Sequence, residues 1–247
     1  MYKLVVATTL RMYNYIMGLR GQKPKGKVKI KWSADFAYAA GLIVTDGSLS
    51  KDMRHLNFVS TDLELIKLFK KLLKLENKIG EKKYKESIGK RKKCYVFQFG
   101  DVLLFNFLCD IGIKPNKTKT IKEVKIPKKY YADFLRGHFD GDGSSYSYFD
   151  KRWKNSFMFY VTFVSASKKH IYWIQKMNKE FYGVDGYITK VKDKDFYQLR
   201  YAKKEGLVIS KKMYYNPEVP CLIRKCKKLF DSIKKNAQVA ELVYAYD

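Results

Sequence analysis

Hydrophobic positions along the chain follow two patterns, one typical of helices and one typical of strands, and the same series occurs twice. Residues 34–45 and 130–141 are apolar on nearly every side, which predicts two buried helices. Later in each series, apolar residues at steps of three and four predict an amphipathic helix, at 61–75 and at 167–183. Ser33 stands directly before the first helix and is a candidate N-cap.

Strands are predicted on both sides of the amphipathic helices. Apolar runs at 56–60 and 157–165 predict one strand in each series, and a basic hairpin with an alternating strand follows at 82–100 and 186–204. Both series close with a basic and apolar segment, which is 111–121 in the first and 219–230 in the second. The shared order predicts an α+β fold in which one unit has been duplicated within a single chain.

The duplication divides the chain into four parts. We expect a basic N-terminal extension at 1–33, a first repeat at 34–125, a second repeat at 126–230 and a C-terminal tail at 231–247.

Composition narrows the class of partner. The 247 residues include 51 Lys and Arg against 24 Asp and Glu, a formal net charge of +27, together with 20 Tyr and 16 Phe. Such aromatic content excludes a disordered basic tail, and no apolar run approaches the ~18 residues that span a bilayer. The four cysteines form no CxxC pair, which favours an intracellular, reducing compartment over a disulfide framework or a zinc site. The charge favours nucleic acid as partner over a membrane surface or a merely solvated Lys-rich exterior.

The two nearly apolar helices end in matching segments, AAGLIVTDG (39–47) and LRGHFDGDG (135–143). Glycine inside a helix costs about 1 kcal/mol relative to alanine, so Gly41 and Gly137 indicate that the two helices pack closely against each other.

Close packing of these helices would bring Asp46 and Asp142 together. Two carboxylates 4 Å apart repel by about 4 kcal/mol at an effective dielectric of 20, so such a pair either keeps a proton or binds a cation. Hard divalent cations take oxygen ligands, and the carbonyls of Thr45 and Gly141 are candidates for two more. The alternative is that each Asp only caps a turn before its Gly.

The two segments resemble the paired signature of LAGLIDADG homing endonucleases, in the single-chain form with two motifs. They match at the packing glycine, at the apolar positions and at the closing Asp-Gly, and the resemblance extends over about residues 34–230. The first copy departs from the family pattern at Val44, where many members carry an acidic residue that is not the metal-binding one. The resemblance implies two pseudo-symmetric αββαββα repeats, whose antiparallel sheets form a saddle over duplex DNA with the motif helices between them.

The resemblance also implies an activity. A monomer would cleave both strands of double-stranded DNA at a long, non-palindromic target, with Asp46 and Asp142 holding divalent metal at the scissile phosphates. The metal would be Mg²⁺ or Mn²⁺, with Ca²⁺ as a non-catalytic substitute. Phosphodiester hydrolysis by such ions needs no nucleophilic side chain.

Four further residues are candidates for the same site. The family places a basic residue late in each repeat, and Lys117 and Lys225 stand in matching places. Each would polarise the attacking water or offset charge, or else contact the DNA backbone. Ser60 and Ser165 close equivalent strands and are candidates for holding water near the metals.

Target recognition is expected from the strands and hairpins. Polar residues that alternate with apolar ones are candidates for reading base edges in the major groove, and these are His55, Asn57, Gln98, Gln198 and Arg200. Hairpin cations more simply hold phosphates, and these are Lys90, Arg91, Lys92, Lys93, Lys192 and Lys194. Phe157, Phe159 and Phe163 are expected in the core.

Two other functions remain open at this stage. The same fold serves RNA maturases, which bind an intron RNA and help it splice, and it could serve a DNA-binding regulator without catalysis. Retention of both aspartates favours the nuclease. The absence of a His-Asn terminus favours a free-standing or intron-borne enzyme over an intein.

Overall fold

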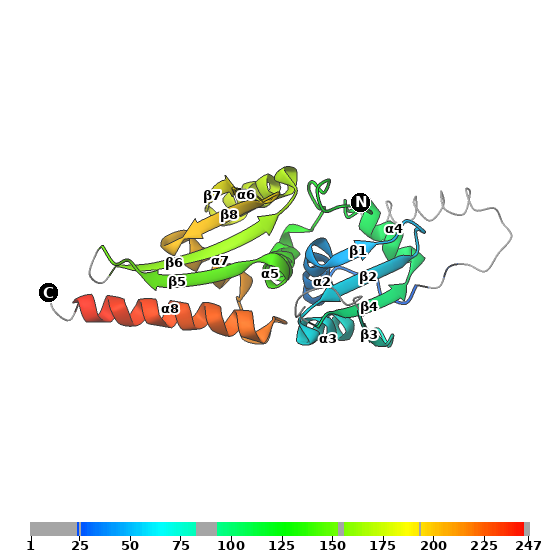
Figure 1. Ribbon diagram of the computed structural model, residues 1–247, viewed down its shortest axis with the longest axis horizontal. Helices are drawn as coiled ribbons and strands as arrows, with labels where there is room; N and C mark the ends of the chain where they lie inside the picture. Colours follow the sequence, from blue (N-terminus) through cyan, green and yellow to red (C-terminus); the bar gives the residue numbers. More distant parts are fainter. Residues whose placement is uncertain (1–23, 25, 83–92, 153–155, 193, 245–247) are drawn as a thin grey trace, which may run out of the picture.

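The computed structural model describes residues 24, 26–82, 93–152, 156–192 and 194–244, with the backbone alone for 236–244. It contains two repeats of the same α+β unit, which lie at opposite ends of the long axis with α2 and α5 between them (Figure 1). Most of the extension predicted at 1–33, namely residues 1–23 and 25, lies outside the described residues, as do the hairpin cations Lys90, Arg91 and Lys92.

The first repeat has the order αββαββα, as the family resemblance implies. Its strands form an antiparallel sheet in the order β1-β2-β4-β3. The elements are α2 (Ala34–Thr45), β1 (Gly47–Leu49), β2 (His55–Ser60), α3 (Leu63–Leu72), β3 (Ile79–Glu81), β4 (Tyr95–Gly100) and α4 (Val102–Asp110).

The second repeat has the same order and adds one long helix. Its antiparallel sheet has the order β5-β6-β8-β7, equivalent to that of the first. The elements are a 3₁₀ turn at Lys128–Tyr130, α5 (Tyr131–Asp142), β5 (Ser144–Phe149), β6 (Phe157–Ser165), α6 (Lys168–Tyr182), β7 (Tyr187–Lys190), β8 (Tyr197–Ala202), α7 (Lys203–Met213) and α8 (Ile223–Tyr244). The predicted α+β class and duplication are confirmed.

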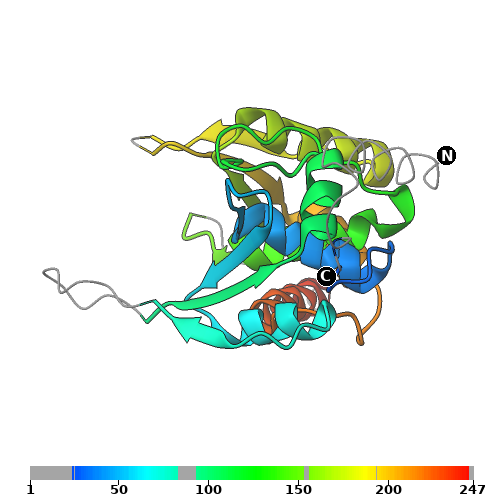
Figure 2. The same ribbon diagram turned by 90° about the vertical axis from the view of Figure 1, so that its right-hand side faces the viewer.

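Each sheet has one covered and one open face. In the first sheet Leu56, Phe58 and Phe97 turn inward, and Phe58 stacks on Phe69 of α3 with ring centroids 4.3 Å apart. In the second sheet, Phe157, Phe159 and Phe163 are buried, as predicted. In Figure 2 most of the helices lie on one side of the molecule, and the strands of both sheets extend toward the other side.

The helices α2 and α5 meet at their glycines. A Cβ at Gly41 would lie 2.2 Å from the Phe134 carbonyl oxygen, and a Cβ at Gly137 would lie 2.1 Å from the Tyr38 carbonyl oxygen. No side chain fits at either position without moving backbone, which confirms the packing role predicted for both glycines. Ser33 is the N-cap of α2, since its Oγ accepts a hydrogen bond from the Phe36 amide at 3.1 Å.

The structure differs from the sequence prediction at two boundaries. Strands β1 and β5 begin directly after the motif helices, whereas the Asp-Gly-Ser segments suggest turns. Helix α8 is continuous across residue 230, where the sequence predicts the start of a separate tail. The reason is that Leu229 and Ser232 are both buried, so the inward-facing side of the helix continues through that boundary.

Among the described helices, none combines the length and apolar character that crossing a membrane requires.

Candidate active site

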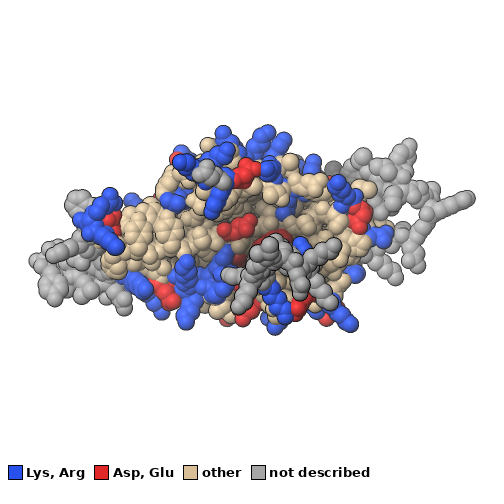
Figure 3. Space-filling view, viewed as in Figure 1, with Lys and Arg blue, Asp and Glu red and all other residues tan. Residues whose placement is uncertain are grey.

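The two motif aspartates lie together at the ends of α2 and α5. Asp46 is the C-cap of α2, and Asp142 is the last residue of α5. The helix ends touch, because a Cβ at Gly141 would lie 1.9 Å from Thr45 Oγ1 and 2.9 Å from Asp46 Oδ2. In the space-filling view, acidic atoms lie in the central hollow, surrounded by Lys and Arg at the rim (Figure 3). The structure therefore brings together one carboxylate from each repeat.

The pKa of each aspartate is raised above its ordinary value. Burial, and after it the charge of Asp142, raises the pKa of Asp46 to about 6. Asp142 is open to solvent, yet enough protein surrounds it that desolvation raises its pKa as well. Within the described residues neither carboxylate forms an ion pair. Free protein thus resists full ionisation of the pair, which a bound cation would favour.

Lys117 reaches this site from the loop after α4. Its side chain is buried, and Nζ donates a hydrogen bond to the Gly47 carbonyl at 2.6 Å. Burial lowers its pKa to about 8, although the charges of Asp142 and Asp46 act in the opposite direction. An ammonium carries three protons, so two remain for water or phosphate.

Lys225 reaches the site from the first turn of α8 and is bound more completely. Its Nζ donates to the carbonyls of Phe139, Gly141 and Gly143 at 2.9, 2.8 and 2.7 Å. These bonds use all three ammonium protons and satisfy carbonyls at the end of α5, which otherwise lack helical partners. Burial lowers the pKa of Lys225 to about 8 as well.

The remaining donors around the aspartates determine whether a metal fits. No cluster of three or more His, Cys, Asp or Glu side chains that could hold a metal occurs in the described part of the chain. The Gly141 carbonyl, one of the two predicted ligands, accepts a hydrogen bond from Lys225, and the role of the Thr45 carbonyl stays a prediction. The Thr45 hydroxyl donates to the Leu42 carbonyl at 3.0 Å and lies 3.3 Å from Asp46 Oδ2. Two carboxylates with few other protein ligands fit a hard divalent cation that takes its remaining oxygens from water and substrate phosphate.

Ser60 and Ser165 occupy equivalent positions, as the last residues of β2 and β6. Each hydroxyl oxygen accepts a backbone N–H two residues later, from Asp62 and from Ser167, at 3.1 Å in both cases. Both serines thus form turns that lead into α3 and α6, and their predicted water-positioning role remains a prediction.

The open face of the first sheet carries small hydrogen-bonding side chains. Asn57 and Gln98 are paired across β2 and β4, and Gln98 is exposed. Asn57 Nδ2 donates to Ser50 Oγ at 3.2 Å. His55 is hydrogen-bonded to Asp52, and this bond lowers the pKa of the Asp52 carboxyl to about 2.

The open face of the second sheet is aromatic. Arg200 lies within 6 Å of three tyrosine rings, with its guanidinium carbon 5.7 Å from Tyr146, 5.8 Å from Tyr160 and 5.6 Å from Tyr187. It also donates to the Tyr187 hydroxyl at 3.1 Å and to Gln198 Oε1 at 3.2 Å. From the sequence, Arg200 and Gln198 are predicted to contact DNA bases separately. In the structure they are hydrogen-bonded to each other, and Arg200 also contacts the tyrosines.

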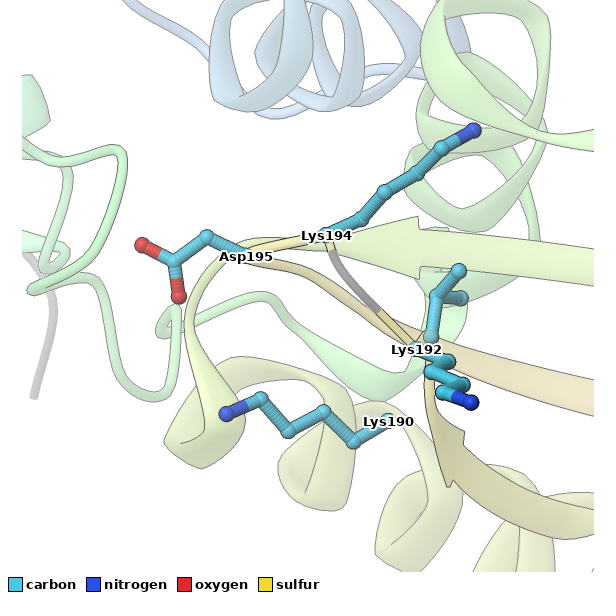
Figure 4. Close-up of a pocket in the computed structure, with 5 residues that line it drawn as sticks. Lys190, Lys192, Lys194 and Asp195 are labelled. Carbon is cyan, nitrogen blue, oxygen red and sulfur yellow. The ribbon is translucent and has the colours of Figure 1, made fainter.

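The described hairpin cations border these faces. Lys93 forms an ion pair with Glu81 at 2.6 Å. Lys192 and Lys194 are exposed on the hairpin between β7 and β8, where they point away from Asp195 (Figure 4). Asp195 forms an ion pair with Lys119 of the first repeat.

A buried network behind the aspartates was not predicted from the sequence. Asp140 accepts hydrogen bonds from the Tyr38 hydroxyl at 2.7 Å, the Leu222 amide at 2.8 Å and the Tyr214 hydroxyl at 3.3 Å. This carboxylate therefore joins α2, α5, the end of α7 and the start of α8. The sequence contains one signal for this network, which is the acidic residue Asp140 on a helix that is predicted to be buried on nearly all sides. A buried charge requires partners. The equivalent position in the first motif is Val44.

Comparisons with known proteins agree with this fold. The family model for the LAGLIDADG-like domain matches residues 33–120 and again 129–213. No curated protein matches the sequence.

Several solved structures have a similar fold at low sequence identity. The LAGLIDADG homing endonuclease I-GzeII, in complex with its DNA target, is 13% identical with a TM-score of 0.57, over 87% of this chain and 93% of that one. I-SmaMI, bound to uncleaved DNA in the presence of calcium ions, is 12% identical with a TM-score of 0.52, over 87% and 97%. Full-length DUF199/WhiA from Thermatoga maritima is 15% identical with a TM-score of 0.51, over 89% and 69%. At these identities the likeness shows the fold alone.

The family match is of a different kind, since it covers both repeats and includes both motif helices. The chain belongs to the LAGLIDADG-like domain family and carries two copies of the domain.

Proposed function

We propose that this protein is a site-specific endonuclease that hydrolyses both strands of duplex DNA with divalent metal held by Asp46 and Asp142. The observation that carries the proposal is the meeting of these two carboxylates, one from each repeat, at the touching ends of α2 and α5. Acidic atoms are visible in the central hollow of the molecule (Figure 3), where a duplex lying across both sheets would place its backbone.

The residues of the chain have separable tasks in this reaction. Asp46 and Asp142 would hold Mg²⁺ or Mn²⁺, which when bound would supply an activated water and neutralise charge on the departing oxygen. Lys117 places a cation beside the carboxylates with two protons free to meet developing negative charge. Lys225 fixes the end of α5 and thereby the position of Asp142.

Duplex DNA is the polyanion that fits the rest of the surface. The net charge of +27 favours a long phosphate backbone. The two open faces differ in chemistry, one polar and one aromatic, so the two half-sites that they read should differ, and the target is non-palindromic. Because one chain supplies both carboxylates and both faces, a monomer suffices. Such an enzyme acts inside the cell or an organelle, where its DNA target is.

The way the tyrosines pack on the open face of the second sheet argues against the alternative function, that of an RNA maturase. Tyr146 and Tyr160 stack on each other, with centroids 5.0 Å apart and planes 20° from parallel. One face of each ring is therefore covered by the other ring, and the Arg200 guanidinium lies within 6 Å of both ring centroids. Sheets that bind single-stranded RNA present free aromatic faces on which unpaired bases stack.

A non-cleaving DNA-binding protein is the second candidate. The similarity to DUF199/WhiA structures supports it, because a LAGLIDADG fold is then shared by proteins not described as endonucleases. The two candidates differ in one measurable property, which is hydrolysis.

The test is cleavage of a randomised duplex library in Mg²⁺, followed by sequencing of the cut ends. We expect discrete sites cut by the wild type, no cutting after chelation of Mg²⁺, and none by Asp46→Asn. Asp35→Asn removes an exposed carboxylate from the opposite end of the same helix and should cut like the wild type. Tight binding without hydrolysis by the wild type would favour the non-cleaving candidate, and metal-independent cutting would contradict the proposed mechanism.

A further inference from the structure

Helix α8 lies along the outer edge of the second sheet. The strand order makes β5 an edge strand, and α8 runs beside it (Figure 1). Ser147 of β5 donates a hydrogen bond to Ser232 of α8 at 3.1 Å, and Leu229 of the helix is fully buried. One side of α8 is thus fixed against the edge of the sheet.

The neighbouring side of α8 is basic and borders an open trough. Lys228 and Lys235 are seven residues apart, close to two helical turns, so they lie on one stripe, and Lys227 is adjacent. With Tyr146 and Ser147 of β5, these lysines line a trough of about 540 Å³ between the helix and the strand. All three lysines are exposed.

These lysines are not neutralised by the protein. Asp231 is the one acidic residue in the trough lining, and within the described residues none of the three lysines forms an ion pair. Arg224, which also borders the trough, is paired with Asp62 of the first repeat at 2.6 Å. The trough therefore presents unpaired positive charge, visible as Lys and Arg along α8 on the same face as the central acidic atoms (Figure 3).

The width of the sheet determines what would lie in this trough. Four strands spaced about 4.8 Å apart span about 14 Å, whereas the major groove of B-DNA is about 12 Å wide. A sheet of this width that enters the groove brings its edge strand to the groove wall. The wall is the sugar-phosphate backbone, and α8 lies immediately beyond β5 on that side.

We propose that the trough between α8 and β5 binds consecutive phosphates of one DNA strand along the half-site that the second sheet contacts. This inference rests on the proposed function, because it assumes that the open sheet faces hold a duplex. It assigns α8 a binding role in addition to carrying Lys225 into the site, and it makes the grip on the two half-sites unequal, since the first repeat has no counterpart of α8 among the described elements.

The experiment compares two triple variants on a cleavable target. The test variant is Lys227→Ala, Lys228→Ala and Lys235→Ala. The matched control is Lys176→Ala, Lys211→Ala and Lys212→Ala, which removes the same charge from α6 and α7, the helices on the covered face of the same sheet. A third variant with arginine at 227, 228 and 235 keeps the charge of the trough.

Affinity and its salt dependence are measured in Ca²⁺, with phosphate-ethylation interference to locate contacts. Each neutralised phosphate adds about 0.9 to the slope of log K against log salt. We expect the test variant to lose 2–3 units of slope and about 10- to 100-fold affinity at 0.15 M salt. In the test variant, interference by ethylation should vanish at neighbouring phosphates on one strand of one half-site. The arginine variant should keep the wild-type affinity, salt dependence and interference pattern.

Two results would overturn the inference while leaving the proposed function intact. One is equal loss of affinity in the test and control triples, with wild-type cleavage present. The other is an unchanged interference pattern in the test variant, which would show that the lysines of α8 do not contact DNA phosphates. Failure of the wild type to bind or cut any duplex would instead refute the proposed function itself.

Discussion

The two lysines at the candidate active site occupy matching places in the two repeats but make very different contacts. Lys225 gives all three protons to carbonyls at the end of α5, whereas Lys117 gives one to Gly47. Lys117 is buried and Lys225 is half-buried, and desolvation lowers the pKa of each to about 8. A residue that is present in both repeats therefore need not have the same task in each. We infer that Lys225 mainly maintains the structure and Lys117 mainly serves the chemistry.

The sheets differ in the same manner. The first presents separate polar side chains such as Asn57 and Gln98, while the second ties Arg200 and Gln198 into a tyrosine cluster. One face is suited to independent contacts with single bases, the other to a rigid surface that acts as a unit. Pseudo-symmetry of the backbone therefore does not extend to the recognition surface.

The largest expected effect on stability comes from Lys225→Met. It leaves three carbonyls without a partner where little water reaches, and each unpaired buried group costs about 1–3 kcal/mol. After allowing for the buried charge that is also removed, we expect a loss of about 3 kcal/mol and a Tm lower by about 6–12 °C. Lys228→Met, an exposed change on the same helix, serves as control. Thermal unfolding within 2 °C of the wild type would contradict the structural role of Lys225.

Lys117→Met should show the opposite balance. Loss of one cation that meets developing charge typically costs about 100-fold or more in rate, so kcat should fall by about that factor. Its Tm should stay within a few degrees of the wild type, because only one hydrogen bond is lost and a buried charge is removed. Since the pKa of Lys117 is about 8, kcat/KM of the wild type should decline above pH 8 as the ammonium loses its proton. Single-turnover cleavage at 20 °C tests the comparison, and a greater loss in Lys225→Met than in Lys117→Met would reverse it.

Much of this arrangement could be predicted from the sequence. The period of the apolar residues located α2, α3, α5 and α6, and the strand predicted at 157–165 coincides with β6. Gly41 and Gly137 were informative because close packing against another helix is one of the few features that explain a glycine in a buried helix. Lys117 and Lys225 could be placed near the aspartates only through the family resemblance, since neither shares a local pattern with them.

The rest depends on contacts that no local pattern contains. The three tyrosines around Arg200 come from β5, β6 and β7. The alternation of polar and apolar residues in β8 alone could therefore not show that these rings surround Arg200 or that its guanidinium has partners within the protein. Asp140 is satisfied by groups as distant along the chain as Tyr38 and Leu222. Strands β1 and β5 were missed because Asp-Gly usually signals a turn, whereas here each Gly lies against the preceding helix, as the 2.7 Å approach of a Gly47 Cβ to the Ile43 carbonyl shows.

Asp46→Asn should stabilise the free protein while it removes activity. The pKa of Asp46 in the folded protein, about 6, lies above its ordinary value of 3.8, so the folded state binds more protons between these values. Wild-type stability is therefore lost as pH rises from about 4 to 6, and the cost is complete above 6. We expect Asp46→Asn to gain about 1–3 kcal/mol at pH 7 and almost nothing at pH 4. Urea unfolding at both values measures this, with Asp35→Asn as the control that should gain nothing.

The smallest effects should separate the two recognition faces. Gln98→Ala removes an exposed amide from the polar face and should relax preference at one base pair, by about 1–3 kcal/mol. Arg200→Ala loosens several tyrosines at once, so we expect a smaller loss of preference spread over neighbouring base pairs of the other half-site. Profiling both variants on all single-base substitutions of the target distinguishes these patterns. Sharp loss at one position in Arg200→Ala would restore the simple base-reading role and weaken the contrast between the sheets.

If one carboxylate from each repeat serves a single shared metal site, cleavage of the two DNA strands should depend on both aspartates, and strand-resolved cleavage measures this. A target labelled differently on its two strands is cut in Mg²⁺ by the wild type, by Asp46→Asn and by Asp142→Asn, with binding measured in parallel. We expect each variant to bind DNA and to lose cleavage of both strands by at least about a thousandfold, because the metal needs both carboxylates. Loss of only one strand in each variant would show two independent sites, and cleavage of both strands at the wild-type rate by either variant would contradict the account.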